Sequence, residues 1–289
     1  MHDLGQLFRT QRGLTLFSQN TLGAFGLLSA VLQVALALWG DVRPSTSQRW
    51  ILLAALLAAS LVFGIIRSWP QRSVSRSFSN PDMTVTVKVG DLFEQPSHLI
   101  VGFTDTFDTD LTDGLVISPE SVQGQFQKKV YAGDTLKLDD DLSDRLSSVP
   151  ARTSESRSDK PNGKLTRYPI STVVTLGEPS QHYFCVAYSE MQNDLIAKSN
   201  VDYLWRSLDA AWNAVYLHAQ RKTVSMPIIG SELARVSCLN RESLLKMIAL
   251  SFVARSRQDP VCKHLQIVVH PKDYDHINML EIDAFLRTL

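Results

Sequence analysis

Two long stretches near the start of the chain contain no charged residue, one from Gly13 to Gly40 and the other from Trp50 to Ile66. Leucine is the most frequent residue in both. Each stretch is long enough to cross a hydrocarbon layer of roughly 30 Å at about 1.5 Å per residue. The pattern therefore predicts an N-terminal transmembrane hairpin over residues 1–70, with helices at about 20–39 and 50–68.

A signal peptide and a soluble helical hairpin are both less consistent with these stretches. A cleaved signal peptide would end in a small-x-small site, which the first stretch lacks, and a second apolar stretch follows it here. A buried hairpin of a soluble protein would keep a polar face toward water, and neither stretch has one. We therefore favour the membrane hairpin.

The distribution of arginines predicts how the hairpin is oriented. The link between the helices, residues 41–49, is so short that the helices must run antiparallel. Two arginines precede the first helix and three follow the second, while the link holds two arginines and one aspartate. This modest positive-inside bias predicts a two-pass protein of the inner (cell) membrane, with both termini and the soluble domain in the cytoplasm.

Four alanines in the second stretch, Ala54, Ala55, Ala58 and Ala59, form small-xxx-small pairs. Such pairs let helix backbones approach closely, and they would allow hairpins of different subunits to associate. Alanine is also simply common in membrane helices, so the pattern alone does not establish that these residues pack against another helix.

The rest of the chain alternates between strand and helix patterns. Residues 71–82 are rich in serine and arginine and are predicted to be a linker, and residues 139–163 are predicted to be a mobile surface insertion. Strands are predicted at 84–89, 98–103, 171–176, 183–188, 223–229 and 265–270, and helices at 118–130, 201–220, 240–255 and 276–289. Residues 83–289 should therefore form a three-layer α/β/α sandwich with a mixed sheet.

Composition excludes several classes of function. The formal net charge is zero, and no cluster of Lys and Arg with interleaved aromatic residues is present, which argues against a nucleic-acid partner. The three cysteines are far apart and are predicted to be free thiols. The seven histidines are scattered, and the acidic run 139–141 is typical of a solvated turn, so no metal site is predicted.

In α/β sheets ligands bind beyond the carboxyl ends of the strands, which directs attention to three loops. The first begins Val-Gly-Asp-Leu at residues 89–92, and this pattern after an apolar strand resembles the opening of macro domains, which bind ADP-ribose and its derivatives. The resemblance implies that Asp91 accepts a hydrogen bond from the adenine amino group. The third loop, MPIIGSELARVS at 226–237, is similar to the macro-domain phosphate loop. Its main-chain N–H groups, aided by the helix start at Asn240, would hold a diphosphate.

The second loop narrows the resemblance. IVGFTDTFDT at 100–109, followed by ISPESVQGQF at 117–126, resembles the divergent macro domains of Thoeris anti-phage effectors, which pair this domain with two N-terminal membrane helices. The resemblance covers essentially the whole chain. It implies ligand contacts from Asp91, Leu92, Gly102, Phe103, Thr104, Asp105, Phe107, Asp108, Gln123, Gly124, Gly230, Ser231, Glu232, Leu233, Ala234, Arg235 and Val236.

The resemblance also implies a function. In type II Thoeris systems a TIR-domain partner makes an ADP-ribose-type signal, associated with a histidine conjugate; the macro domain binds it, and the protein oligomerises and compromises the lipid bilayer. No further cofactor is implied. Hydrolytic macro domains carry an Asn-Ala-Ala-Asn run and a Gly-rich stretch, both missing from Gly102 to Asp108, which favours a receptor over an enzyme. A membrane-tethered ADP-ribosyl hydrolase, with Asp105 or Asp108 as base, and a scaffold without nucleotide affinity are the alternatives.

Overall fold

The computed structural model describes residues 7–8, 11–38, 45–69, 71–231, 236 and 238–289. These residues form two units, one over Met1–Arg72 with Asn278–Glu281, and one over Ser73–Ile277 with Ile282–Leu289. The boundary after Arg72 assigns most of the predicted linker to the second unit.

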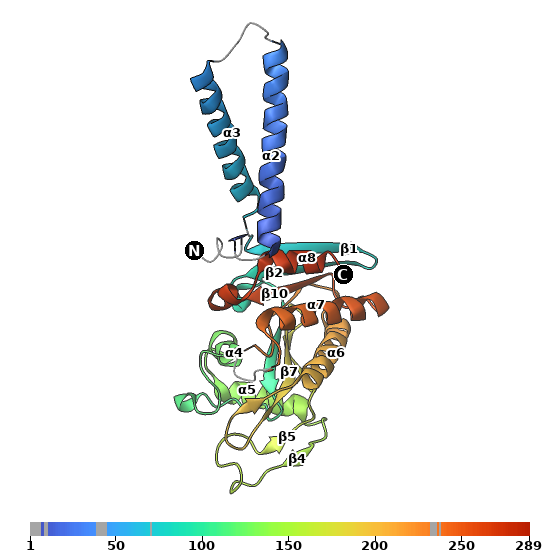
Figure 1. The fold of residues 1–289 in the computed structure, drawn as a ribbon. Helices are drawn as coiled ribbons and strands as arrows, with labels where there is room; N and C mark the ends of the chain where they lie inside the picture. Colours follow the sequence, from blue (N-terminus) through green and yellow to red (C-terminus); the bar gives the residue numbers. More distant parts are fainter. Residues whose placement is uncertain (1–6, 9–10, 39–44, 70, 232–235, 237) are drawn as a thin grey trace. The chain divides into compact units, whose positions relative to one another are not determined.

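The first unit contains the two predicted apolar helices (Figure 1). They are α2 (Gln11–Leu38) and α3 (Thr46–Arg67). Ser45 caps α3 in a capping box with Gln48, which fixes its start. Both helices are long and apolar enough to cross a membrane. Buried positions make up 0% of the most apolar window of α2 and 11% of that of α3, unlike the core helix of a soluble protein.

Small and polar residues mediate the contact between α2 and α3. Ser60 and Gly64 are the buried residues of α3, and a Cβ at Gly64 would overlap the side chain of Thr21. The amide of Asn20 donates a hydrogen bond to Ser68 Oγ at 2.8 Å. The four alanines at 54, 55, 58 and 59 are mostly exposed. They are therefore not the main contact inside the hairpin, and their role between subunits stays a prediction.

The second unit is built on a mixed sheet with the strand order β1-β2-β10-β9-β3-β7-β6, and β8 pairs with β7. β1 and β2 are antiparallel, as are β6 and β7, while β2, β10, β9, β3 and β7 run parallel. The strands are β1 (Ser73–Ser79), β2 (Asp82–Val89), β3 (His98–Thr104), β6 (Val173–Glu178), β7 (Gln181–Met191), β8 (Ala197–Lys198), β9 (Val224–Met226) and β10 (His264–Val269). The carboxyl ends of the five parallel strands therefore meet at one edge.

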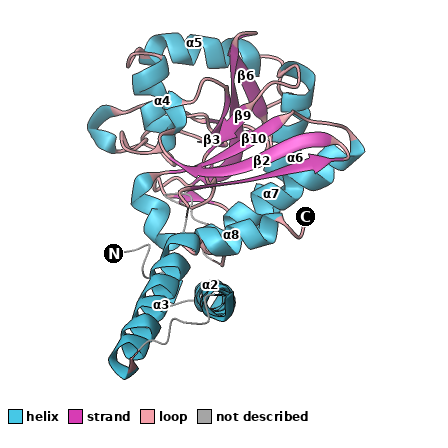
Figure 2. Cartoon of the chain, turned by 90° about the horizontal axis from the view of Figure 1, so that it is seen from above, coloured by secondary structure: helices cyan, strands magenta, loops and turns pink. Residues whose placement is uncertain are grey.

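Helices cover both faces of this sheet, which confirms the predicted three-layer α/β/α sandwich (Figure 2). These helices are α4 (Val122–Val130), α5 (Thr135–Leu146), α6 (Val201–His218) and α7 (Arg241–Gln258), while α8 (Met279–Leu286) begins in the first unit and ends in the second. Short 3-10 turns are η1 (Leu92–Glu94), η2 (Thr112–Gly114) and η3 (Pro271–His276). On the face of α6 and α7, the buried Trp212 ring packs edge-on against Phe252 at 5.3 Å and donates to Ser251 at 3.0 Å.

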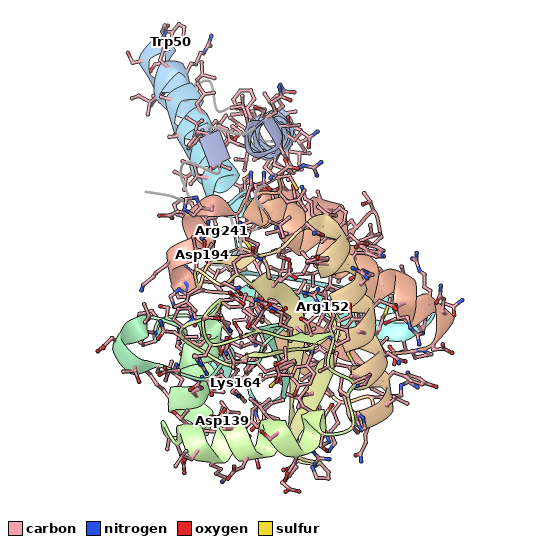
Figure 3. All side chains as sticks on the ribbon, turned by 90° about the horizontal axis from the view of Figure 1, so that it is seen from below. Trp50, Asp139, Arg152, Lys164, Asp194 and Arg241 are labelled. Atoms are coloured by element: carbon pink, nitrogen blue, oxygen red, sulfur yellow. The ribbon has the colours of Figure 1, made fainter. Side chains whose placement is uncertain are left out.

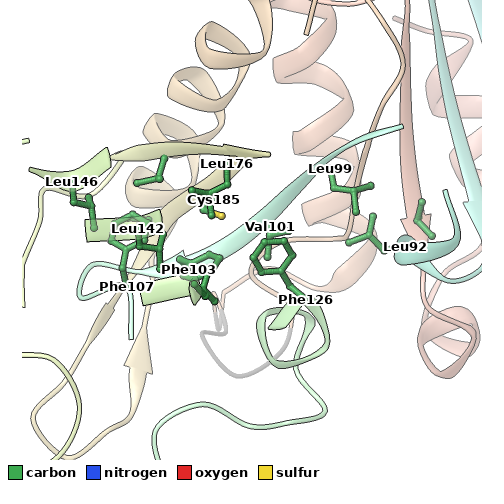
Figure 4. Close-up of a cluster of buried hydrophobic side chains, with 14 residues drawn as sticks. Leu92, Leu99, Val101, Phe103, Phe107, Phe126, Leu142, Leu146, Leu176 and Cys185 are labelled. Carbon is green, nitrogen blue, oxygen red and sulfur yellow. The ribbon is translucent and has the colours of Figure 1, made fainter. Parts of the chain in front are cut away.

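The opposite face holds a core between β3, β7, α4 and α5 (Figure 4). Leu142 and Leu146 of α5 are buried in this cluster together with Phe103 of β3 and Phe126 of α4. The Phe103 ring packs at 6.2 Å from that of Phe126 and at 5.6 Å from that of Phe107. This aromatic core fixes the end of β3, where the predicted second ligand loop begins.

Two segments differ from the sequence prediction. Ser73–Ser79, predicted to be linker, form β1, because their alternating hydroxyls pair with β2: Ser75 Oγ lies 2.8 Å from Thr86 Oγ1. An edge strand exposes one face, so its polar residues resemble a linker. The start of the predicted insertion 139–163 belongs to α5, whose Leu138 is buried one turn before Leu142. The acidic run lies on the outer side of an amphipathic helix.

The rest of the predicted insertion belongs to a longer segment, residues 147–168, which we call the insertion from here on. It carries a two-stranded sheet of β4 (Thr153–Ser154) and β5 (Thr166–Arg167). It is attached to the domain by fully buried charges rather than by apolar contacts alone. The ammonium of Lys160, 0% exposed, lies 3.2 Å from the carboxylate of Asp108, also 0% exposed. The nearby Lys164 pairs with Asp139 of α5 at 2.6 Å, closer to the surface (Figure 3).

Candidate functional site

A cavity of about 340 Å³ lies along the edge where the five parallel strands end. Each of these strands contributes to its lining: Gly90 follows β2, His270 follows β10, Pro227 follows β9, Thr104 ends β3, and Met191 ends β7. Small-molecule sites in proteins usually have volumes of about 300–1,000 Å³ and occur at this position in α/β sheets. The cavity is therefore the candidate ligand site of the second unit.

One end of the cavity is formed by Asp91 and the turn that follows it. Asp91 caps η1: its Oδ1 accepts a hydrogen bond from the Phe93 amide at 2.8 Å, and its Oδ2 forms an ion pair with Lys129. The Lys129 ammonium also lies 5.3 Å from the centre of the Phe93 ring. Burial raises the pKa of Asp91, but Lys129 and the Phe93 amide together lower it by a larger amount. The pKa of Asp91 is therefore below its usual value. Asp91 is thus an ionised hydrogen-bond acceptor at the rim of the cavity.

The middle of the cavity is formed by the turn after β9. Gly230 has a φ of +84°, a conformation that favours glycine, and its carbonyl accepts from the Val236 amide at 3.1 Å. Ser231 Oγ donates to the Ile228 carbonyl at 2.7 Å, which keeps this hydroxyl within the turn. The turn leads to α7, whose start is capped by Asn240. Backbone N–H groups near a helix start attract anions.

β3 and α4 form the inner wall. A Cβ at Gly102 would approach Tyr188 Cε1 to 2.5 Å, so glycine is required where β3 passes the Tyr188 ring. Thr104 lines the cavity, and its hydroxyl lies 3.1 Å from that of Thr106, which donates to Asp108 at 2.5 Å. This chain of hydrogen bonds connects the cavity wall to the buried ion pair beneath the insertion.

The predicted site residues are distributed over several environments. Those that line the cavity are Asp91, Leu92, Gly102, Phe103, Thr104, Gln123, Gly230 and Ser231. Those that do not line it are Asp105, Phe107, Asp108, Gly124 and Val236. The four residues Glu232, Leu233, Ala234 and Arg235 lie outside the described residues. Ligand contact by any of the seventeen stays a prediction.

The two loop aspartates are engaged by the insertion and not by the cavity. Asp105 is fully buried and accepts two hydrogen bonds from Arg167 Nη1, at 3.0 and 3.2 Å, and one from the Met191 amide at 2.8 Å. Asp108 is paired with Lys160. Both carboxylates therefore have charged partners from a segment more than fifty residues later in the chain.

Several lining residues were not predicted from the sequence. They include Leu115, Val116 and Ile117 before α4, Met191, Leu195 and Ile196 near the end of β7, and His270 and Asp273 after β10. Because ligands in α/β sheets bind beyond the carboxyl ends of the strands, the loops after β7 and β10 could have been predicted together with the loops after β2, β3 and β9. The aliphatic residues carry no chemical signature that a sequence could reveal. Among the described residues, no group of three His, Cys, Asp or Glu side chains could hold a metal ion.

Comparisons with known proteins add a family to this geometry. The family described as Thoeris protein ThsA, Macro domain, matches residues 85–270. Among solved structures, the Oceanobacillus iheyensis macrodomain with ADP has 13% sequence identity and a TM-score of 0.48, covering 76% of this chain and 100% of that chain. The same macrodomain with MES bound has 15% identity and a TM-score of 0.46, covering 75% and 100%. A mutant of it with ADPR has 15% identity and a TM-score of 0.44, covering 73% and 97%. No curated protein matches the chain.

Proposed function

The chain belongs to the Thoeris ThsA macro-domain family, and on this premise we propose that it is a membrane-anchored receptor of bacterial anti-phage immunity. Its ligand is an ADP-ribose-derived nucleotide that binds in the cavity at the strand ends. The observation that carries this proposal is the arrangement of that cavity, which places an ionised Asp91 and the Gly230 turn along one edge of the sheet.

The order of the strands suits an elongated ligand. Asp91 follows β2, the Gly230 turn follows β9 two strands further along, and Met191 ends β7 two strands beyond that. The adenine ring would bind at Asp91, which accepts hydrogen bonds, and the diphosphate would bind at the turn before α7. The second ribose and any group attached to it would then extend toward β7, where the walls are mainly aliphatic.

The polar groups of the cavity favour binding over hydrolysis. Asp105 and Asp108, the bases considered for a hydrolase, are both fully buried and paired with Arg167 and Lys160. A general base must lie within hydrogen-bond reach of the proton it removes. In the described part of the cavity the carboxylates are those of Asp91 and Asp273, and each has a cationic partner. We therefore propose a receptor and not an enzyme.

The response to the ligand is proposed to occur in the membrane. The signal would be a histidine–ADP-ribose-type conjugate made by a TIR-domain protein, which acts as a functional partner. Binding would favour oligomers whose hairpins disrupt the bilayer, with both termini and the macro domain in the cytoplasm. A ligand that moves such an equilibrium from 1:99 to 99:1 must bind the active state more tightly by about 5.5 kcal/mol.

Thermal unfolding of the full chain in detergent, with and without nucleotide, tests the binding site. ADP-ribose or its histidine conjugate at about one hundred times its Kd should stabilise by about 2.7 kcal/mol, which raises the Tm of a domain of this size by about 5–10 °C. Asp91→Ala should lose most of this shift. Asp209→Ala, on the exposed side of α6, is the matched control and should keep it.

Two results would contradict the proposal. No shift with either nucleotide would leave only the scaffold hypothesis. Catalytic release of free ADP-ribose from the conjugate, followed by chromatography over many turnovers, would establish the hydrolase instead.

A further inference from the structure

Six residues of α2 recur at intervals of four, three, four, three and four positions: Gln19, Gly23, Gly26, Ala30, Gln33 and Ala37. All six are exposed. Since an α-helix has about 3.6 residues per turn, this spacing places them on one side of α2. We call this set the α2 seam. It combines four small residues with two amides that can each donate and accept hydrogen bonds.

The α2 seam is not used to pack the hairpin. A Cβ added to Gly23 or Gly26 would meet nothing within 4 Å, whereas a Cβ at Gly64 of α3 would overlap Thr21 on another side of α2. Within the described residues, neither Gln19 nor Gln33 has a side-chain hydrogen-bond partner. Asn20, which lies outside the seam, does have one in Ser68. The seam is therefore a surface left over after the chain has folded.

The chemistry of Gln33 indicates what covers this surface. If α2 spans the membrane, as the proposed function requires, Gln33 lies inside the apolar segment and faces hydrocarbon. Polar side chains in a bilayer usually face other protein groups, because lipid offers them no hydrogen bond. A second copy of the same helix presents the same amide at the same depth. Two glutamine amides satisfy each other, so the seam is complementary to itself.

We propose that the α2 seam is the contact between copies of this chain in the membrane, with Gln33 hydrogen-bonded across it and Gly26 and Ala30 at the closest approach. The copies insert with the same orientation, so the helices in contact are parallel. The spacing of the seam, about 3.5 residues, predicts a left-handed crossing of about 20°. This inference rests on the membrane anchoring in the proposed function and assigns the oligomer contact to α2, not to the alanines of α3.

A neighbouring face of α2 provides the competing surface. Leu27, Val31, Val34 and Leu38 follow the same kind of spacing and are 59–76% exposed. In water this apolar face would be the stronger candidate. In a bilayer it gains little by leaving lipid, because lipid tails are as apolar as leucine side chains. It is expected to face lipid, which makes it a matched control.

Disulfide cross-linking of the full chain in its native bacterial membranes distinguishes the two faces. In a Cys238→Ser background, which removes the exposed native thiol, single cysteines are placed in the seam (Ala30→Cys, Ala37→Cys) or on the control face (Val31→Cys, Val34→Cys). Oxidation is carried out with and without added ADP-ribose. The seam positions should form dimers at least about fivefold more than the control positions in one of the two conditions. Equal or greater cross-linking on the control face, or none at either face, overturns the proposal.

A second variant tests the amide without impairing insertion. Gln33→Leu makes α2 more apolar, so the helix should still insert, yet dimers at Ala30→Cys should weaken about three- to tenfold, as expected for a lost interhelical hydrogen bond. Gln33→Asn, which keeps an amide, should retain more of the dimer than leucine does. Equal cross-linking in all three chains would show that the amide has no part in the contact.

Failure of this inference can be told apart from failure of the proposed function. Carbonate extraction and the ADP-ribose thermal shift are measured on the same preparations. A chain that does not fractionate with membranes contradicts both. A chain that stays in membranes and binds ADP-ribose but gives no seam-specific dimers contradicts only the α2 seam.

Discussion

Removing the ammonium of Lys160 should strongly destabilise the second unit. Lys160 and Asp108 are both 0% exposed and lie 3.2 Å apart. At an effective dielectric of about 20, charges at that distance attract by about 5 kcal/mol, and burial of both groups offsets much of this. Lys160→Met removes the attraction but leaves the buried carboxylate behind. Breaking one side of such a pair costs about 3–5 kcal/mol.

The structure suggests the upper half of this range. Lys160 Nζ also donates to the Lys164 carbonyl at 2.6 Å, so the substitution leaves an acceptor as well as a carboxylate without this donor. Thr106 and the Lys164 amide still donate to Asp108, which limits the loss. For a domain of about two hundred residues, a loss of about 4–5 kcal/mol lowers the Tm by about 8–20 °C.

The assay is thermal unfolding of the full chain in detergent, followed by circular dichroism. Lys164→Met is the matched control, because Lys164 is four residues away and pairs with Asp139 nearer the surface. Its substitution removes this partly exposed pair and a hydrogen bond from Lys164 Nζ to the Phe107 carbonyl, and should cost about 1–2 kcal/mol. If Lys160→Met unfolds within about 2 °C of the wild type, a difference worth less than about 1 kcal/mol, the buried pair contributes nothing net and the reasoning is wrong.

Three further predictions use the same measurements. Gly163→Ala should cost more stability than Gly133→Ala: both glycines have positive φ, but only at Gly163 would a Cβ approach Asp108, at 2.7 Å. The pKa of His98 lies below its ordinary value of 6.5, mainly because the ring is buried and also because positive groups lie nearby. The folded chain therefore loses stability as the pH falls below about 6.5, where the unfolded chain takes up a proton at this residue more readily. His98→Phe should reduce the difference in Tm between about pH 7.5 and pH 5.5. Of the three thiols, that of Cys238 alone should react with Ellman's reagent in the folded chain, while all three react in denaturant.

The sequence predicts the elements of the second unit that have strong periodicity. Helices α6 and α7 and strands β2, β3 and β10 lie where the apolar pattern places them, within a few residues. The errors occur where polar residues face outward in regular structure. β1 was mistaken for a linker because Ser75 and Ser77 alternate with few apolar residues, and α5 was hidden by an acidic run on its exposed side. Period alone does not distinguish an exposed edge from a loop.

In the candidate site, too, some features could be predicted from the sequence and others could not. Asp91 and Gly230 were predicted from the resemblance of their loops to those of macro domains, and both line the cavity. The environment of Asp105 and Asp108 could not be found, because it depends on Arg167 and Lys160, which no local pattern links to them. A loop rich in aspartates resembles a ligand-binding or catalytic loop until its long-range partners are known.

Those long-range partners have a consequence for ligand selection. Two buried ion pairs, Asp105 with Arg167 and Asp108 with Lys160, fix the Gly102–Thr109 loop on the side away from the cavity. Thr104 of this loop is linked to Asp108 through the hydroxyl of Thr106. A wall fixed in this way is preorganised, so little of the ligand's binding free energy is spent on ordering it. Adaptation to different groups at the β7 end must then come from Leu195, Ile196 and the aliphatic residues before α4, which belong to neither ion pair. If the proposed function is correct, substitutions there should change which conjugate binds, while substitutions at the ion pairs should weaken all conjugates alike.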